Sequence, residues 1–152
     1  MNPIRREGEM FVVEVPKQAV DLIETLCGEL ETLLGSDSPL LERLFPPPYG
    51  DDTERNEGYS ALAGPELVEH RLEALTTVRT VLSSQRVTED QFMAWMRSLN
   101  DMRLVLGTMM DITDDDHPAA LDPRHSQAFD VYEFLGVLLE LTVSALTDGL
   151  DQ

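Results

Sequence analysis

The chain has 152 residues, of which 29 are acidic and 11 basic, so its formal net charge is −18. This length predicts a single domain over residues 1–152, and 42% hydrophobic with 26% charged residues is typical of a folded chain and not of a disordered one. One cysteine excludes a disulfide within the chain, and no apolar run approaches the roughly 20 residues that cross a bilayer. We expect no signal peptide at Met1–Glu9, no membrane association and a cytoplasmic location.

The acidity is spread along the whole chain. The first 76 residues carry 16 acidic and 6 basic side chains, and the last 76 carry 13 and 5. Affinity for nucleic acids comes largely from Lys and Arg that replace phosphate counterions, so we expect no direct binding to nucleic acid. A negative surface keeps a protein soluble, and it also favours encounters with basic protein partners.

The N-terminal third predicts a hairpin followed by a helix. Ile4–Arg6 and the β-branched run Met10–Val15 flank a Gly-containing turn, which predicts a small β-hairpin over about residues 4–15. After Pro16, apolar residues recur at spacings of three and four, as in an amphipathic helix. Gly35 follows the last of them and predicts a left-handed cap at the helix end.

The middle of the chain predicts short elements separated by breaks. Ser38 and Pro39 open a short helix that ends at Leu44, before the three prolines at 46–48. The acidic stretch 51–58 reads as a loop that leads into a short helix over 59–62. Apolar periodicity then predicts a longer helix over 65–83.

The C-terminal half predicts two long helices around an acidic loop. Thr88 and Gln91 form a capping-box pattern that opens a helix over about 89–110. Residues 111–122 read as an acidic loop, and a last helix follows over about 126–146. The predicted fold class is mostly α: a compact helical bundle with a small N-terminal β-hairpin.

The helix over 89–110 has a charged residue within its apolar face. At 100° per residue the apolar positions on that face are Phe92, Trp95, Met96, Leu99, Leu106 and Met110. Arg103 projects into the middle of them, with Asn100 and Gly107 on its flank, whereas Asp101 lies on the opposite face. A guanidinium in a core needs a partner, so another element must supply one or the face must border a polar groove.

Two interpretations of this face stay open. Arg103 and Asn100 form either a buried network that fixes helix packing or a recognition groove for a carboxylate-bearing ligand or partner. Gly107 predicts either the close backbone approach of another segment or the beginning of the helix end, because glycine is costly inside a helix. The helix also carries five of the seven methionines, which serve either as core filler or as an adaptable binding surface. Together with Trp95, these methionines predict a homodimer.

Two features carry weaker chemical patterns. Four residues match positions one, three, five and twelve of a calcium loop, but position six is Asp116 where glycine is needed: Asp111, Thr113, Asp115 and Asp122. His117 and His125 would extend them to a transition-metal cluster. A metal-dependent enzyme built on the loop from Asp111 to His125 is the alternative that this pattern offers. We favour a solvated acidic loop, and we expect no metal, no cofactor and no enzyme activity.

Cys27 lies on the apolar face of the first helix, where a thiol behaves as a small hydrophobic group. A redox role would need exposure and a stabilised thiolate. The neighbouring carboxylates Glu24, Glu29 and Glu31 disfavour the thiolate. Cys27 is therefore a weak redox candidate.

Two segments resemble a known family. The run Trp95–Thr108, which reads WMRSLNDMRLVLGT, and the run Val131–Gly136, which reads VYEFLG, resemble the actinobacterial AosR-type family. The resemblance covers nearly the whole chain, including the break at Leu44–Tyr49. Its motif residues, which are our candidates for an interaction or structural site, are Trp95, Asn100, Asp101, Arg103, Gly107 and Thr108.

The resemblance implies a cytoplasmic, non-enzymatic regulator of oxidative stress that acts on transcription through a sigma factor or RNA polymerase. It also implies, as an alternative, an accessory role in Clp-dependent proteolysis. The redox branch of the family is associated with a Cys-x-x-x-Cys pair. Here Ile23 and Glu31 stand four residues before and after Cys27, so an internal thiol switch is excluded.

Overall fold

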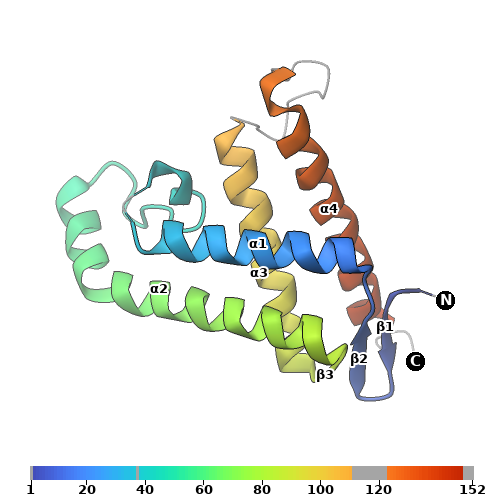
Figure 1. Cartoon of the computed structure of the whole chain (residues 1–152). Coiled ribbons are helices and arrows are strands. Elements are labelled where there is room, and N and C mark those ends of the chain that lie inside the picture. Colours follow the sequence, from blue (N-terminus) through green and yellow to red (C-terminus); the bar gives the residue numbers. More distant parts are fainter. Residues whose placement is uncertain (1, 37, 111–122, 149–152) are drawn as a thin grey trace.

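The computed structural model describes residues 2–36, 38–110 and 123–148, which form four α-helices and a small antiparallel sheet (Figure 1). Along the chain the elements are β1 (Ile4–Glu7), β2 (Met10–Val13), α1 (Lys17–Leu34), the 3₁₀ helix η1 (Pro39–Leu41), α2 (Thr53–Ser84), β3 (Arg86–Val87), α3 (Glu89–Met109), the 3₁₀ helix η3 (Pro123–His125) and α4 (Ser126–Thr147). This confirms the mostly α fold with its N-terminal hairpin. None of the described helices has the length and apolar character that crossing a membrane requires.

The N-terminal hairpin forms as the sequence predicts, and a third strand joins it. β1 and β2 pair antiparallel, with Ile4 opposite Val13. The turn between them contains Gly8 at φ +66°, a conformation that glycine adopts without steric cost. β3 then pairs with β2, with Val87 opposite Phe11. The sequence does not predict β3, because a strand of two residues shows no alternation.

The end of α1 differs from the prediction. Gly35 has φ −84°, so the expected left-handed cap is wrong. Its N–H donates instead to the carbonyl oxygens of Glu31 at 3.3 Å and Thr32 at 3.2 Å. Such bonds tighten the last turn of a helix without positive φ, so the backbone does not require glycine here.

α2 is one helix of 32 residues, where the sequence predicts a loop over 51–58 and two shorter helices. Its start is capped by Asp52, whose side chain accepts a hydrogen bond from the Arg55 N–H at 3.1 Å. The first turns are largely exposed, so they lack the apolar periodicity that would have predicted them. Pro65 lies inside the helix, and Figure 1 shows the bend in α2 that a proline without its N–H donor explains.

α3 and α4 form close to their predicted bounds. The capping box of α3 is confirmed: Thr88 Oγ1 accepts from the Gln91 N–H at 3.2 Å, and Gln91 Oε1 accepts from the Thr88 N–H at 2.9 Å. α4 ends at Thr147, one residue beyond the prediction. The helix expected after Ser38 is shortened to η1.

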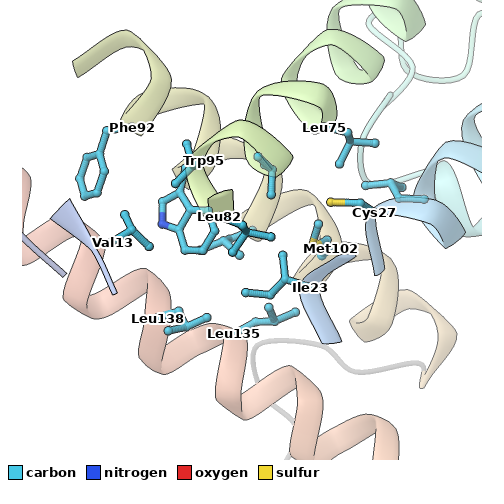
Figure 2. Close-up of a cluster of buried hydrophobic side chains, with 14 of the residues drawn as sticks. Val13, Ile23, Cys27, Leu75, Leu82, Phe92, Trp95, Met102, Leu135 and Leu138 are labelled. Atoms are coloured by element: carbon cyan, nitrogen blue, oxygen red, sulfur yellow. The ribbon is translucent and has the colours of Figure 1, made fainter. Parts of the chain in front are cut away.

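The core is built around Trp95 of α3, which has no exposed surface. Its Nε1–H donates to Thr142 Oγ1 of α4 at 3.1 Å, so its polar atom is satisfied. Phe92, one turn earlier, stacks on Phe11 of β2 with ring centroids 4.1 Å apart, which ties the sheet to the helices. Figure 2 shows the surrounding side chains, which are Val13, Ile23, Cys27, Leu75, Leu82, Met102, Leu135 and Leu138.

The buried face of α3 is wider than the predicted one: Phe92, Trp95, Leu99 and Met110 are buried as the sequence predicts, and Met96 and Leu106 are half-buried. Ala94, Ser98, Asp101 and Met102 are buried beside Trp95. Arg103 is half-buried, so it lies at the edge of the buried face and not at its centre. The reason is that α3 packs against α2 as well as α4. The side of α3 that α2 covers carries polar residues, which in the sequence are typical of an exposed surface.

Candidate functional site

The motif residues of α3 face different parts of the molecule. Trp95 belongs to the core. Asn100 and Asp101 line a cavity that α2 also lines. Arg103 and Gly107 face α4. Asp101 and Arg103 therefore face different neighbours, as the sequence predicts, whereas Asn100, which was expected beside Arg103, lines the cavity with Asp101.

Arg103 has an aromatic partner. Its Cζ atom lies 4.0 Å from the centroid of the Tyr132 ring. A Cβ atom built on Gly136 would lie 3.3 Å from Arg103 Nε, so the guanidinium rests directly on the backbone of α4. Nε is buried and makes no hydrogen bond. Within residues 2–36, 38–110 and 123–148, no carboxylate forms an ion pair with Arg103, and the partner that another described element supplies is the Tyr132 ring.

Gly107 is closely approached by side chains and not by the backbone of another segment, and it lies two residues before the end of α3. A Cβ atom there would lie 3.0 Å from Arg43 Nη1 and 3.4 Å from Tyr132 Cε2. The next residue, Thr108, donates from Oγ1 to the Leu104 carbonyl at 2.9 Å, an ordinary bond of a helical threonine to its preceding turn. Gly107 therefore makes room for two side chains, whereas Thr108 has no visible role beyond its own helix.

The two segments that carry the family resemblance meet at this point. Arg103 and Gly107 come from α3, and Tyr132 and Gly136 come from α4. Each helix contributes a planar group, the Arg103 guanidinium or the Tyr132 ring. One turn after it, each helix has a glycine that leaves room for the planar group of the other helix. This arrangement favours the packing interpretation of Arg103. Asn100 is exposed and takes no part in it.

Asp101 forms the ion pair that sequence analysis missed. Arg71 Nη1 of α2 donates to Oδ1 of Asp101 at 2.9 Å and to Oδ2 at 2.7 Å. The Asp101 side chain is 7% exposed and that of Arg71 30%. Burial raises the pKa of Asp101, while the charges of Arg71 and Arg97 act in the opposite direction. Thirty residues separate the pair in the sequence, so no spacing could have predicted it.

Beside this ion pair lies a cavity of about 410 Å³, which we call the arginine groove. Its polar lining is Arg43, Arg71, Arg97, Asn100 and Asp101, and its apolar lining includes Met96, Leu104, Leu139 and Val143. The residues come from α2, α3, α4 and the segment after η1. The carboxylate-recognition hypothesis made for Arg103 and Asn100 therefore shifts to this groove, which Asn100 lines and Arg103 does not.

A second cavity, the Met-lined groove, lies between α1 and α3 and has a volume of about 370 Å³. Its lining is Leu26, Glu29, Leu30, Thr32 and Leu33 of α1, Leu40 of η1, and Met102, Val105, Leu106 and Met109 of α3. Met109 is 42% exposed. The methionines of α3 thus divide between core filling, by Met102, and an accessible apolar surface.

Cys27 is fully buried in the core. Burial raises the pKa of its thiol to about 11, with Glu31 and Glu24 contributing and Arg79 opposing. The thiol is therefore protonated at neutral pH and sheltered from oxidants.

The metal hypothesis falls largely outside the described residues, because 111–122 are not among them. Within the part of the chain that is described, no group of three His, Cys, Asp or Glu side chains could hold a metal ion. His125, the described member of the proposed cluster, follows Pro123 in η3.

Comparisons with known proteins agree with the motif resemblance. A family model described as a domain of unknown function (DUF2017) matches residues 1–146. The chain is similar to the putative oxidative stress regulator AosR of Mycobacterium leprae, with 31% identity over 145 residues, 78% of this chain and 66% of the relative. It is also similar to the oxidative stress regulators AosR of Mycobacterium tuberculosis (strain H37Rv) and Mycobacterium bovis, each with 32% identity over 127 residues, 71% of this chain and 58% of the relative.

The chain thus spans between 58% and 66% of the length of these curated relatives. No solved structure matches it. The family model covers nearly the whole chain and includes both motif segments, so the resemblance that they carry is confirmed. The chain belongs to the DUF2017 family.

Proposed function

We propose that the protein is a non-enzymatic regulator of the response to oxidative stress that acts by binding another protein. The observation that carries this proposal is the similarity to relatives named oxidative stress regulators, at 31–32% identity over 71–78% of the chain. Two polar motif residues, Asp101 and Arg103, hold α3 against α2 and α4. Their packing role fits a protein that acts by binding and not by catalysis.

The partner in this proposal is a basic protein of the transcription machinery, a sigma factor or RNA polymerase, met in the cytoplasm. A net charge of −18 attracts a basic surface and accelerates encounter. The Met-lined groove supplies an apolar surface whose flexible thioether side chains adapt to a partner. Glu29 lies at this groove, and Asp21 and Glu24 are exposed further along α1. An amphipathic segment with apolar side chains between Lys and Arg residues fits both features.

In this account the stress signal reaches the protein through its partner and not through Cys27. The thiol is fully buried, and its pKa of about 11 leaves almost no thiolate to react with peroxide. Oxidation of Cys27 would require the core to open first.

Affinity capture from cells, before and after peroxide treatment, tests the proposal when the captured proteins are read by mass spectrometry. We expect enrichment of a sigma factor or RNA polymerase. Met109→Lys places a cation in the Met-lined groove and should abolish this enrichment. Val137→Lys makes the same charge change at a 54% exposed position of α4 outside the groove and should preserve it.

Other outcomes would change the conclusion. Enrichment of Clp protease subunits in place of transcription proteins would favour the accessory role in proteolysis. If Met109→Lys and Val137→Lys reduced the enrichment equally, the binding would depend on overall charge and not on the Met-lined groove.

A further inference from the structure

The arginine groove is an exception to the charge of the chain. Three of the ten arginines, Arg43, Arg71 and Arg97, line this one cavity, whereas the chain as a whole carries −18. One carboxylate, Asp101, lines it with them. The lining therefore gathers cationic side chains in a molecule that is negative along its whole length.

The internal ion pair does not use all the donors of the groove. Among the described residues, Asp101 is held by Nη1 of Arg71 alone, at 2.7 and 2.9 Å. Arg97 is exposed, and it acts on Asp101 through its charge without a hydrogen bond to any described residue. Asn100 is exposed beside it. An arginine side chain presents five N–H donors in a fixed plane, a geometry that matches a carboxylate.

The rest of the lining is apolar. Met96 and Leu104 of α3 and Leu139 and Val143 of α4 complete the cavity, and Val143 is 47% exposed. A volume of about 410 Å³ lies within the range of roughly 300–1,000 Å³ in which proteins bind small ligands. The groove therefore offers cationic donors next to an apolar surface, within the reach of one small group.

We propose that the arginine groove binds a carboxylate carried on a short apolar chain or side chain. Arg97 and Asn100 hold the carboxylate, and Met96, Leu139 and Val143 contact the apolar part. The apolar lining favours this ligand over inorganic phosphate, which has no apolar part to bury. The carboxylate belongs either to a small carboxylic acid or to an acidic segment of a protein, and the inference is independent of the regulatory role proposed above.

NMR titration of the full ¹⁵N-labelled chain at neutral pH and constant ionic strength tests this inference, with hexanoate as the probe. We expect saturable shifts of the Asn100 amide and the Arg97 Nε–H resonances. Hexanamide has the same chain without the charge and should leave them unshifted. Inorganic phosphate, which has the charge without the chain, should bind more weakly than hexanoate.

Variants separate the groove from general charge effects. Arg97→Ala should weaken hexanoate binding about tenfold or more, as expected for the loss of a charged hydrogen-bond donor. Arg55→Ala removes an exposed arginine of α2 that lies outside the groove and should leave binding unchanged. Circular dichroism would establish that both variants fold.

The source of the carboxylate is decided with peptides. Tighter binding of the capped tripeptide Leu-Glu-Leu than of hexanoate, with no binding of Leu-Gln-Leu, would assign the groove to an acidic protein segment. Tighter binding of hexanoate would assign it to small carboxylic acids. Absence of hexanoate shifts at the groove, or equal shifts with hexanamide, would overturn the inference.

Discussion

Arg103 shows how one side chain can define the packing of two helices. Its guanidinium lies over the Tyr132 ring at 4.0 Å and against Gly136. A cation over an aromatic face contributes about 0.5–2 kcal/mol, more when it is shielded from water. Since Arg103 is half-buried and has no carboxylate partner among the described residues, this stack and its packing account for its place in the fold.

A double-mutant cycle measures the contact between Arg103 and Gly136. Gly136→Ala should by itself gain little or lose stability, because its new Cβ would lie 3.3 Å from Arg103 Nε. In an Arg103→Ala background the same change should gain about 1 kcal/mol, the helix-propensity difference between alanine and glycine. Arg103→Ala alone should cost about 1–2 kcal/mol. The measurement is the free energy of unfolding in urea.

Gly28→Ala in α1 is the control for this cycle, because a Cβ there would meet nothing within 4 Å. It should gain about 1 kcal/mol in both backgrounds. If Gly136→Ala behaved like Gly28→Ala in the wild-type chain, the close contact with Arg103 would be refuted.

A second residue-scale prediction concerns pH. Arg79 Nη1 donates to Glu31 Oε2 at 2.9 Å, and these hydrogen bonds hold the pKa of Glu31 below its ordinary value. The ionised form therefore stabilises the fold above the ordinary Glu pKa, and that stabilisation is lost as pH falls through the lowered value. Both side chains are about a third exposed, so the pair contributes only about 0.2–1 kcal/mol.

Urea unfolding of Glu31→Gln should therefore show a loss of stability at neutral pH that disappears in acid. Glu29→Gln is the matched control, since Glu29 lies on the same helix and makes no ion pair with the described residues. A loss that persisted unchanged in acid would show that the Glu31–Arg79 pair does not act through charge.

At the scale of elements, α3 depends on its capping box. Thr88→Ala removes the side-chain acceptor of the Gln91 N–H and should cost about 0.5–2 kcal/mol. Thr25→Ala, at an exposed position inside α1, should be neutral or slightly stabilising, because alanine is the better helix former. Thermal unfolding followed by circular dichroism compares the two, and equal Tm values would contradict the role of the cap.

Elements with strong local patterns were predictable from the sequence. The hairpin has its Gly-containing turn and α3 its capping box, and α1, α3 and α4 have apolar periodicity. The first half of α2 lacks periodicity because it is exposed, and Pro65 reads as a helix start although the helix passes through it. The pairing of β3 with β2 depends on a contact between residues 11 and 87, which no local pattern encodes.

The candidate site was predictable only in part for the same reason. Sequence analysis identified Arg103 and Gly107 as unusual on their own helix, where a charge and a glycine conflict with an apolar face. It could not identify Tyr132 as the partner, because the contact spans two helices. The pairing of Asp101 with Arg71 likewise emerges from the packing of α2 on α3.

At the scale of the whole molecule, the net charge of −18 opposes association between copies of the chain. The sequence predicts a homodimer partly from Trp95. Trp95 is fully buried in the core of its own chain, so it cannot contribute to a dimer surface. The Met-lined groove and the exposed Val137 and Val143 of α4 are the apolar surfaces that such a dimer would use. Two copies of net charge −18 repel each other, so a dimer should strengthen with salt.

Light scattering at low and high salt tests the predicted dimer. A mass that rises above the 17.1 kDa of one chain as salt is added would confirm it. A constant mass of one chain at every salt concentration would remove the prediction.

The proposed regulation of the stress response depends on a surface contact and not on the thiol of Cys27. The most direct measurement is the transcriptional response to peroxide in cells that lack the native gene and express one variant. Cys27→Ala, which removes the buried thiol, should restore the response as fully as the wild-type chain. Met109→Lys should fail to restore it although the protein folds and accumulates. Failure of Cys27→Ala alongside full restoration by Met109→Lys would contradict the account.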